Sequence, residues 1–194
     1  MIKIILILLG ITIVAFIAVQ IFAMNSQNKI ESYSYTLEKS FGTFEIRSYK
    51  ASLFTSVKLP SKDYKKVSSK GFSILAEYIF GGNDKNEKIS MTSPVTISLE
   101  DTMTMMFLVP KKFNKESLPK PNQSIIEFTE EPEKTVAVIT FGGWANDENI
   151  QVYKKKLINL LKEEGIKHTN KFSFLGYNPP FEVFNRKNEI IVEL

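Results

Sequence analysis

The chain has 194 residues, of which 43% are hydrophobic and 24% are charged, a composition typical of one globular domain with a real core. The formal net charge of +4 comes from lysines interleaved with glutamates, so it favours solvated surfaces over the single basic face that nucleic-acid binding requires. Because the chain has no cysteine, disulfides, thiolate metal sites and thiol nucleophiles are excluded.

The N-terminal segment is apolar enough to cross a membrane. Residues 4–24 carry no charge and consist mainly of Ile, Leu, Val, Phe and Ala, and about 20 such residues span the core of a bilayer. A cleaved signal peptide is the alternative, but its apolar stretch usually has about 7 to 15 residues, and Ile21-Phe22-Ala23 is a poor cleavage site. The length of the segment therefore favours an uncleaved anchor.

The charges beside this segment predict its orientation. Lys3 precedes the span, whereas Lys29 beyond it is followed closely by Glu31. The positive-inside rule then predicts a single-pass protein of the cell membrane whose C-terminal domain lies outside the cytoplasm. We divide the chain into a transmembrane anchor over residues 1–24, a polar linker over residues 25–32 and one folded domain over residues 33–194.

The first half of the folded domain has the pattern of strands followed by one helix. Alternating side chains predict strands over residues 33–39, 44–49 and 52–58, the first two joined as a hairpin. Ser61 is suited to cap a helix that ends just before Gly81. The apolar positions of this helix follow helical spacing: Tyr64, Val67, Gly71, Leu75 and Tyr78.

The segment Lys88-Ile89-Ser90-Met91-Thr92-Ser93-Pro94-Val95 closes a loop into a strand. Pro94 has no amide proton, so it belongs at the start or edge of a strand. Strands are predicted over residues 95–99 and 102–109, joined by the tight turn Glu100-Asp101. In the second strand a methionine-rich face points toward the interior, with Met103, Met105, Phe107 and Val109.

The second half of the domain repeats this order of elements. Residues 124–129 and 135–141 are predicted to form a strand pair, and Asn146 or Asp147 then caps a helix that Gly165 follows. Strands over residues 171–177 and 189–194 close the chain. The order of strands, helix and strands thus occurs twice, which predicts a duplicated ββαββ unit and an α+β domain with a curved antiparallel sheet or open barrel.

Five blocks of the domain resemble the SOUL haem-binding family, in the order in which that family has them. The blocks are Phe44-Glu45-Ile46-Arg47-Ser48-Tyr49, Tyr78-Ile79-Phe80-Gly81-Gly82-Asn83, the segment Lys88 to Val95, Phe141-Gly142-Gly143, and Gly176-Tyr177-Asn178-Pro179-Pro180 with Asn185-Arg186-Lys187-Asn188-Glu189-Ile190. The resemblance implies a distorted antiparallel β-barrel of two pseudo-symmetric halves with two flanking helices, similar to the effector-binding domains of bacterial regulators. It also implies non-catalytic binding of haem or a related tetrapyrrole, here at the membrane, for storage, buffering or delivery.

A haem site needs an apolar slot, cations near the propionates and, where the iron is ligated, an imidazole, a thioether or a phenolate. A slot between the first helix of the domain and the sheet would be lined by residues that serve equally well as simple core: Leu53, Tyr64, Phe72, Leu75, Met91, Met103 and Met105. Arg47, Lys65 and Lys88 are the candidate partners of the propionates.

The iron ligand is where this sequence departs from the family pattern. Some members carry a histidine, assigned to the iron, on the strand before the first helix of the domain. Alignment of Phe54-Thr55-Ser56-Val57 places Leu53 at that position, and the one histidine, His168, follows the second helix. A bound haem would therefore be ligated by Met91, Tyr64 or His168, or be held by apolar contact alone.

Three other functions stay open. An effector-binding module would take another amphipathic or cationic small molecule, and a buried, unpaired carboxylate would favour it. An interaction protein with a vestigial pocket would have its slot filled by methionines and phenylalanines. An enzyme would need a polar pair at the cavity, and paired carboxylates among Glu45, Glu77 and Glu189 are the candidates, although ion pairs with Lys or Arg explain them better. The sequence has no nucleophile elbow, phosphate loop or dinucleotide fingerprint.

Overall fold

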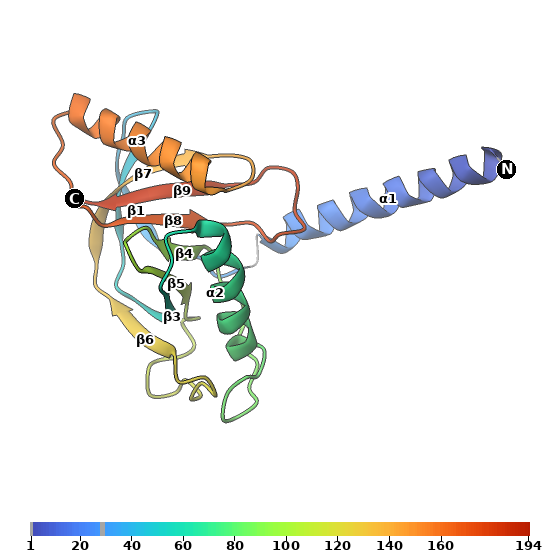
Figure 1. Cartoon of the computed structure of the whole chain (residues 1–194), viewed down its shortest axis with the longest axis horizontal. Helices are drawn as coiled ribbons and strands as arrows, with labels where there is room; N and C mark the ends of the chain where they lie inside the picture. Colours follow the sequence, from blue (N-terminus) through green and yellow to red (C-terminus); the bar gives the residue numbers. More distant parts are fainter. Residues whose placement is uncertain (1, 28–29) are drawn as a thin grey trace.

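The computed structural model describes residues 2–27 and 30–194, with a single nine-stranded antiparallel sheet at its centre. The elements, in chain order, are α1 (Ile2–Gln27), β1 (Tyr35–Ser40), β2 (Glu45–Tyr49), β3 (Ser52–Leu59), α2 (Tyr64–Ile79), β4 (Val95–Ser98), β5 (Met103–Leu108), β6 (Ile126–Glu131), β7 (Lys134–Phe141), α3 (Asp147–Glu163), β8 (Phe172–Gly176) and β9 (Asn188–Glu193). The sheet curls into an open barrel, and α1 projects away from it as a separate rod (Figure 1).

The strand order β1-β2-β7-β9-β8-β4-β5-β3-β6 confirms the duplicated ββαββ unit and adds a feature to it. The first unit is β2-β3-α2-β4-β5 and the second is β6-β7-α3-β8-β9. The first strand of each unit pairs with the second strand of the other, since β2 pairs with β7 and β6 pairs with β3. The two halves therefore exchange one strand each, and β1 is an addition at the edge beside β2.

This exchange corrects one sequence prediction. The strands near residues 124–129 and 135–141 both form, as β6 and β7, but they do not pair with each other. The alternation of side chains predicts that a segment is extended, and it contains no information about which other strand supplies the hydrogen bonds. The predicted hairpin of β1 with β2 and the predicted pair of β4 with β5 are confirmed, and β8 pairs with β9 as well.

The helices begin and end where local chemistry places them. Asn146 caps α3 by accepting a hydrogen bond from the Asn149 amide at 2.8 Å, as predicted. The cap of α2 is Asp63, which accepts from the Lys66 amide at 3.1 Å, and not Ser61. Ser61 instead accepts from the Asp63 amide, because the chain is still in a turn there. The helix α1 continues to Gln27, three residues into the predicted linker.

Both faces of the curved sheet are buried, and each has its own core. Helix α2 packs on β3 and β5, and α3 packs on β7 and β9, so the larger core lies between the helices and the outer face of the sheet. The inner face carries a smaller core that includes Tyr33, Tyr49, Phe54, Met106, Leu108 and Leu175. The predicted methionine face of β5 belongs to the outer core, while Met106 and Leu108 alternate onto the inner face.

Candidate functional site

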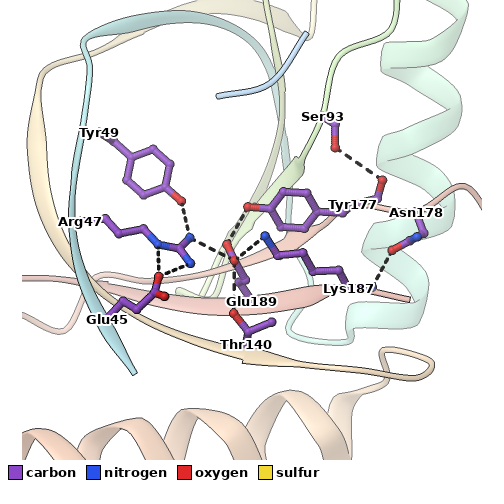
Figure 2. A network of polar contacts seen from close by, with 9 residues as sticks. All are labelled: Glu45, Arg47, Tyr49, Ser93, Thr140, Tyr177, Asn178, Lys187 and Glu189. Carbon is purple, nitrogen blue, oxygen red and sulfur yellow. Dashed lines mark hydrogen bonds and ion pairs between the residues drawn. The ribbon is translucent and has the colours of Figure 1, made fainter. Parts of the chain in front are cut away.

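A network of charged and hydroxyl groups lies inside the curved sheet (Figure 2). Arg47 of β2 and Glu189 of β9 are both buried, and the Arg47 Nη1 atom is 3.0 Å from the Glu189 Oε1 atom. The other side of the guanidinium meets Glu45, with Nε to Oε2 at 2.7 Å. The two strands are not neighbours, because β7 lies between them, so only the twist and curvature of the sheet bring these charges together.

Three more side chains complete the coordination of the Glu189 carboxylate. The Tyr177 hydroxyl donates to Oε2 at 2.6 Å, the Thr140 hydroxyl donates to Oε1 at 3.3 Å, and the Lys187 ammonium lies 2.9 Å from Oε1. Arg47 also donates to the Tyr49 hydroxyl at 3.4 Å. A buried carboxylate with this many donors is fully satisfied, as buried charges in proteins usually are.

The protonation states follow from these contacts. Burial alone would raise the pKa of Glu189, but the Arg47 charge, the Tyr177 hydrogen bond and Lys187 outweigh it and hold the pKa below its ordinary value. Burial and the Glu189 charge raise the pKa of Tyr177. Burial raises the pKa of Tyr49 to about 12, with a further contribution from Glu189. The network is thus an ionised carboxylate held by cations and neutral phenols.

In the barrel interior, the charged groups of this network are already paired with one another. Its two cations and its two carboxylates balance, and each charged group has a partner. Among the described residues, the inner face has buried hydroxyls without a hydrogen-bond partner at Tyr33 and Thr96. The candidate carboxylates Glu45 and Glu189 are in ion pairs with Arg47, and Glu77 accepts from the Gln123 amide at 2.8 Å.

The slot predicted between α2 and the sheet is occupied by side chains. Leu75, Met103 and Met105 are buried in the outer core, and Leu53 and Tyr64 pack against it. A cavity of about 10 Å³ lies at the C-terminal end of α2, where Met91 is part of its lining. Sites that enclose a small organic ligand usually measure about 300 to 1,000 Å³, so this interior does not enclose a haem as it stands.

The outer edge of the same region is partly open. The Phe72 ring on α2 is exposed and packs edge-on against Phe107 of β5, with ring centroids 5.4 Å apart. Met91, half-buried, lines the small cavity together with Phe107. These three residues form an apolar seam between α2 and the segment Ser90–Thr92, which we call the α2 seam. Of the predicted set, Phe72 contacts Phe107 directly, and Met91 lines the small cavity together with Phe107.

The other predicted residues lie elsewhere. Arg47 is on the inner face of the sheet, with its guanidinium already paired, so the structure does not bring it to the α2 seam. The Tyr64 ring packs edge-on against Phe174 at 5.1 Å. His168 contacts its neighbour Thr169 through Nδ1 and places its ring against Phe172. Among the described residues, no group of three or more His, Cys, Asp or Glu could hold a metal ion.

The sequence alone does not predict that the residues of the inner network lie together. Sequence patterns give Tyr49 and Tyr177 no individual role, and they indicate Glu189 only as a possible catalytic carboxylate. One signal was present, because Glu45, Arg47 and Tyr49 alternate along one strand and must share a face. The pairing of that face with Glu189 depends on strand order, which the sequence does not contain.

The comparisons with known proteins agree with this fold. A family model described as SOUL heme-binding protein matches residues 30–193, nearly the whole of the domain. The chain belongs to this family.

The SOUL relatives include two vertebrate proteins. Heme-binding protein 2 of Mus musculus is 32% identical over 158 residues, covering 77% of this chain and 77% of that protein. Heme-binding protein 1 of Xenopus laevis is 26% identical over 174 residues, covering 86% of this chain and 90% of that protein. Among solved structures, the C-terminal domain of EcmrR superposes with a TM-score of 0.61 at 13% identity, covering 82% of this chain and 96% of that chain. That similarity shows the shared fold.

The residues present fit an exposed haem contact better than an enclosed one. Leu53 offers no donor for iron, and it packs against the outer core. The thioether of Met91 on the α2 seam is the nearest donor to a partly exposed apolar surface. A haem that entered beside Met91 would have to displace side chains or the Ser90–Thr92 segment, because the cavity that this segment lines measures only about 10 Å³.

Proposed function

We propose that the SOUL domain of this protein binds haem or a related tetrapyrrole without catalysis, and that α1 holds the domain at a membrane. Membership of a family whose model spans residues 30–193, with relatives named as heme-binding proteins, is the observation that supports it. Among the described residues, one stretch is long and apolar enough to cross a membrane, Ile2–Ile21 of α1 with mean hydropathy 3.0, and it supports the anchor by length and composition, as it would a signal sequence. Storage, buffering or delivery of the ligand outside the cytoplasm is the role that such an anchored binder would serve.

The proposed ligand site is the α2 seam. Phe72 and Phe107 offer an apolar face to the porphyrin, and Met91 offers a thioether to the iron. Lys65 and Lys88 are exposed and lie on α2 and on the segment before Met91, where flexible ammonium groups can reach propionates. Tyr64 and His168 are the alternative iron donors, although their rings pack on Phe174 and Phe172.

A haemin titration of the full chain in lipid nanodiscs tests this proposal, with empty nanodiscs as the blank. A saturable one-to-one Soret shift is expected. Met91→Leu, which keeps the apolar volume and removes the thioether, should weaken binding by about tenfold, equivalent to about 1.4 kcal/mol, and change the ligand signature of the iron. Met103→Leu is the matched control, because Met103 is buried in the same core away from the seam edge.

The opposite result would be a broad absorbance that never saturates, identical in both variants and in the parent. Haem binding would then not extend from the family to this chain. Loss of the ligand signature in Tyr64→Phe or His168→Gln, with Met91→Leu unchanged, would keep the haem proposal and move the iron donor to that residue.

A second candidate function is an interaction protein whose pocket is vestigial. The filled slot favours it, since Leu75, Met103 and Met105 are buried core, and the cavity beside Met91 measures only about 10 Å³. An effector-binding role for cations lacks this kind of support in the barrel interior, because the buried carboxylate of Glu189 is already paired with Arg47 and Lys187. The buried Glu182 carboxylate has an oxygen without a hydrogen-bond partner in the described part of the chain, but it lies in the loop before β9 and lines neither the slot nor the small cavity. The haemin titration separates the two candidates directly.

A further inference from the structure

In the loop between β8 and β9, residues 178–187, large apolar side chains are exposed and a charged side chain is buried. Phe181, Val183 and Phe184 are 56%, 44% and 55% exposed, whereas the carboxylate-bearing Glu182 between them is 3% exposed. Surface loops normally turn their charged residues outward and their large apolar residues inward. Clustered apolar side chains on a loop indicate a surface that another apolar phase covers.

Arg186 and Asn178 bond to the backbone of this loop, whereas the buried Glu182 Oε2 and Arg186 Nε atoms have no hydrogen-bond partner among the described residues. Arg186 donates from Nη1 to the Pro179 carbonyl at 3.0 Å and to the Glu182 carbonyl at 2.6 Å. The Asn178 side chain accepts from the Lys187 amide at 2.6 Å. These bonds fix the shape of the loop around an internal guanidinium, so the apolar side chains are held outward by the backbone.

The loop lies against α1, as Figure 1 shows at the base of that helix. Gln20, 4% exposed, donates from Nε2 to the Phe181 carbonyl at 3.0 Å and accepts at Oε1 from the Val183 amide at 3.0 Å. The Phe184 ring meets Phe16 of α1 edge-on, with centroids 6.4 Å apart. The donor and the acceptor of the Gln20 amide, the one side-chain amide in the apolar run, are therefore both hydrogen-bonded to the loop backbone.

The position of these contacts along α1 sets their depth. At about 1.5 Å per residue, Gln20 lies about 6 Å and Phe16 about 12 Å before the end of the apolar run at Met24. If the run spans the bilayer core, the loop that touches both residues lies below the membrane surface. Backbone at that depth must have its hydrogen bonds made by protein, and the carbonyls of Pro179, Phe181 and Glu182 all have partners.

We propose that the β8–β9 loop inserts into the bilayer beside α1, with Phe181, Val183 and Phe184 among the acyl chains. The partner is the lipid bilayer, because the apolar loop surface is continuous with the apolar surface of α1. Trp144 stacks on Arg186 at 4.0 Å at the base of the loop and is exposed, which suits a tryptophan at the headgroup level. The inference rests on the proposed membrane anchoring by α1, and it adds that the domain is held against the membrane by two segments.

Depth-dependent fluorescence quenching tests the inserted loop in the full chain. The sequence has no cysteine, so single-cysteine variants need no prior substitutions. Phe184→Cys, Ile125→Cys and Ile13→Cys are each labelled with an environment-sensitive nitrobenzoxadiazole dye. The proteins are reconstituted into two sets of phosphatidylcholine vesicles, one with lipids spin-labelled at the head group and one with lipids spin-labelled deep in the acyl chain, and quenching by either set is scored. Ile125 is 53% exposed at the start of β6 and is the matched control for Phe184, while Ile13 reports whether α1 is inserted.

The expected result is blue-shifted emission and several-fold stronger quenching at position 184 than at position 125. Gln20→Leu, which removes both hydrogen bonds to the loop, should lower the quenching at 184 and leave it unchanged at 13. Thr12→Val is its control, because the Thr12 hydroxyl bonds only to Leu9 of its own helix among the described contacts.

Three results would overturn the proposal. Quenching at position 13 together with water-like emission at 184 would mean that α1 spans the membrane while the loop does not enter it. Blue-shifted emission at 184 without lipid quenching, varying with the protein-to-lipid ratio, would identify a second protein copy as the partner. Absence of quenching at 13 would instead refute the anchor, and the loop proposal with it. Haemin binding to the protein in the same vesicles is measured separately, so that the haem proposal can fail or hold independently of these three results.

Discussion

Arg47 is the residue on which the interior of the barrel depends. Its guanidinium bridges Glu45 on its own strand and Glu189 on a strand two positions away in the sheet. It also lies 4.3 Å from the Tyr35 ring, which covers it from the edge strand. A buried pair of this kind contributes little net free energy compared with apolar residues, but it penalises every arrangement in which one charge lacks its partner.

Removing the cation alone should therefore destabilise the fold. Arg47→Met leaves Glu189 buried with Lys187 as its remaining cation, and we expect the free energy of unfolding to fall by about 3 kcal/mol. Urea denaturation of residues 30–194 measures it. Lys58→Met is the control, because Lys58 and Glu127 form an exposed pair whose loss should cost less than about 1 kcal/mol. Equal costs for the two variants would mean that the inner network is not a structural centre.

At the scale of elements, the C-terminal end of α2 controls the approach to the α2 seam. Gly81 adopts φ of 113° just past the helix, a conformation that favours glycine. The buried Asn83 side chain then donates to the carbonyls of Tyr78 and Glu87, at 3.1 and 2.8 Å. Its oxygen accepts from the amides of Lys85 and Glu87. One side chain thus folds the turn that leads into the segment carrying Met91.

Asn83→Ala should unfold this turn at a measurable cost. Four hydrogen bonds are lost and three backbone groups are left without a partner, since the Tyr78 carbonyl also accepts from the Gly81 amide, and we expect a loss of about 3 kcal/mol in the free energy of unfolding. Hydrogen exchange of residues 83–92 should also accelerate more than exchange in β7. Asn122→Ala, at an exposed position nearby, is the control and should change neither quantity. Slow exchange throughout the turn in Asn83→Ala would show that the backbone holds this shape unaided.

At the scale of the whole molecule, the exchange of β2 and β6 makes the two halves depend on each other. Strand β7 needs β2 on one side, and β3 needs β6 on one side. Each ββαββ unit alone therefore has an unpaired strand edge and an incomplete inner core, to which both halves contribute. We therefore expect the two duplicated halves to fold as one cooperative domain.

Fragments test this dependence. Residues 30–123 and residues 124–194 should each lack a cooperative thermal transition, since neither can pair its exchanged strand. An equimolar mixture should recover the circular dichroism spectrum and the transition of the intact segment 30–194, which is the control. If either fragment unfolded cooperatively by itself, the exchanged strand would be an accessory and the halves would be independent units.

Some properties of this protein follow from its sequence by itself. The helix ends at Asn146, Gly81 and Gly165, the apolar run of α1, the alternation of the strands and the family blocks are local features, so short-range rules suffice to predict them. The family resemblance likewise predicted the two pseudo-symmetric halves.

Only the tertiary structure decided which faces and partners these elements have. It placed Arg47 inside the barrel and Met91 outside it, paired β6 with β3, and set Gln20 against a loop more than 160 positions away in the chain. Alternation fixes that neighbouring side chains point to opposite faces, but strand order and sheet curvature fix what each face meets. Those depend on contacts between distant residues, whose free energy no local pattern contains.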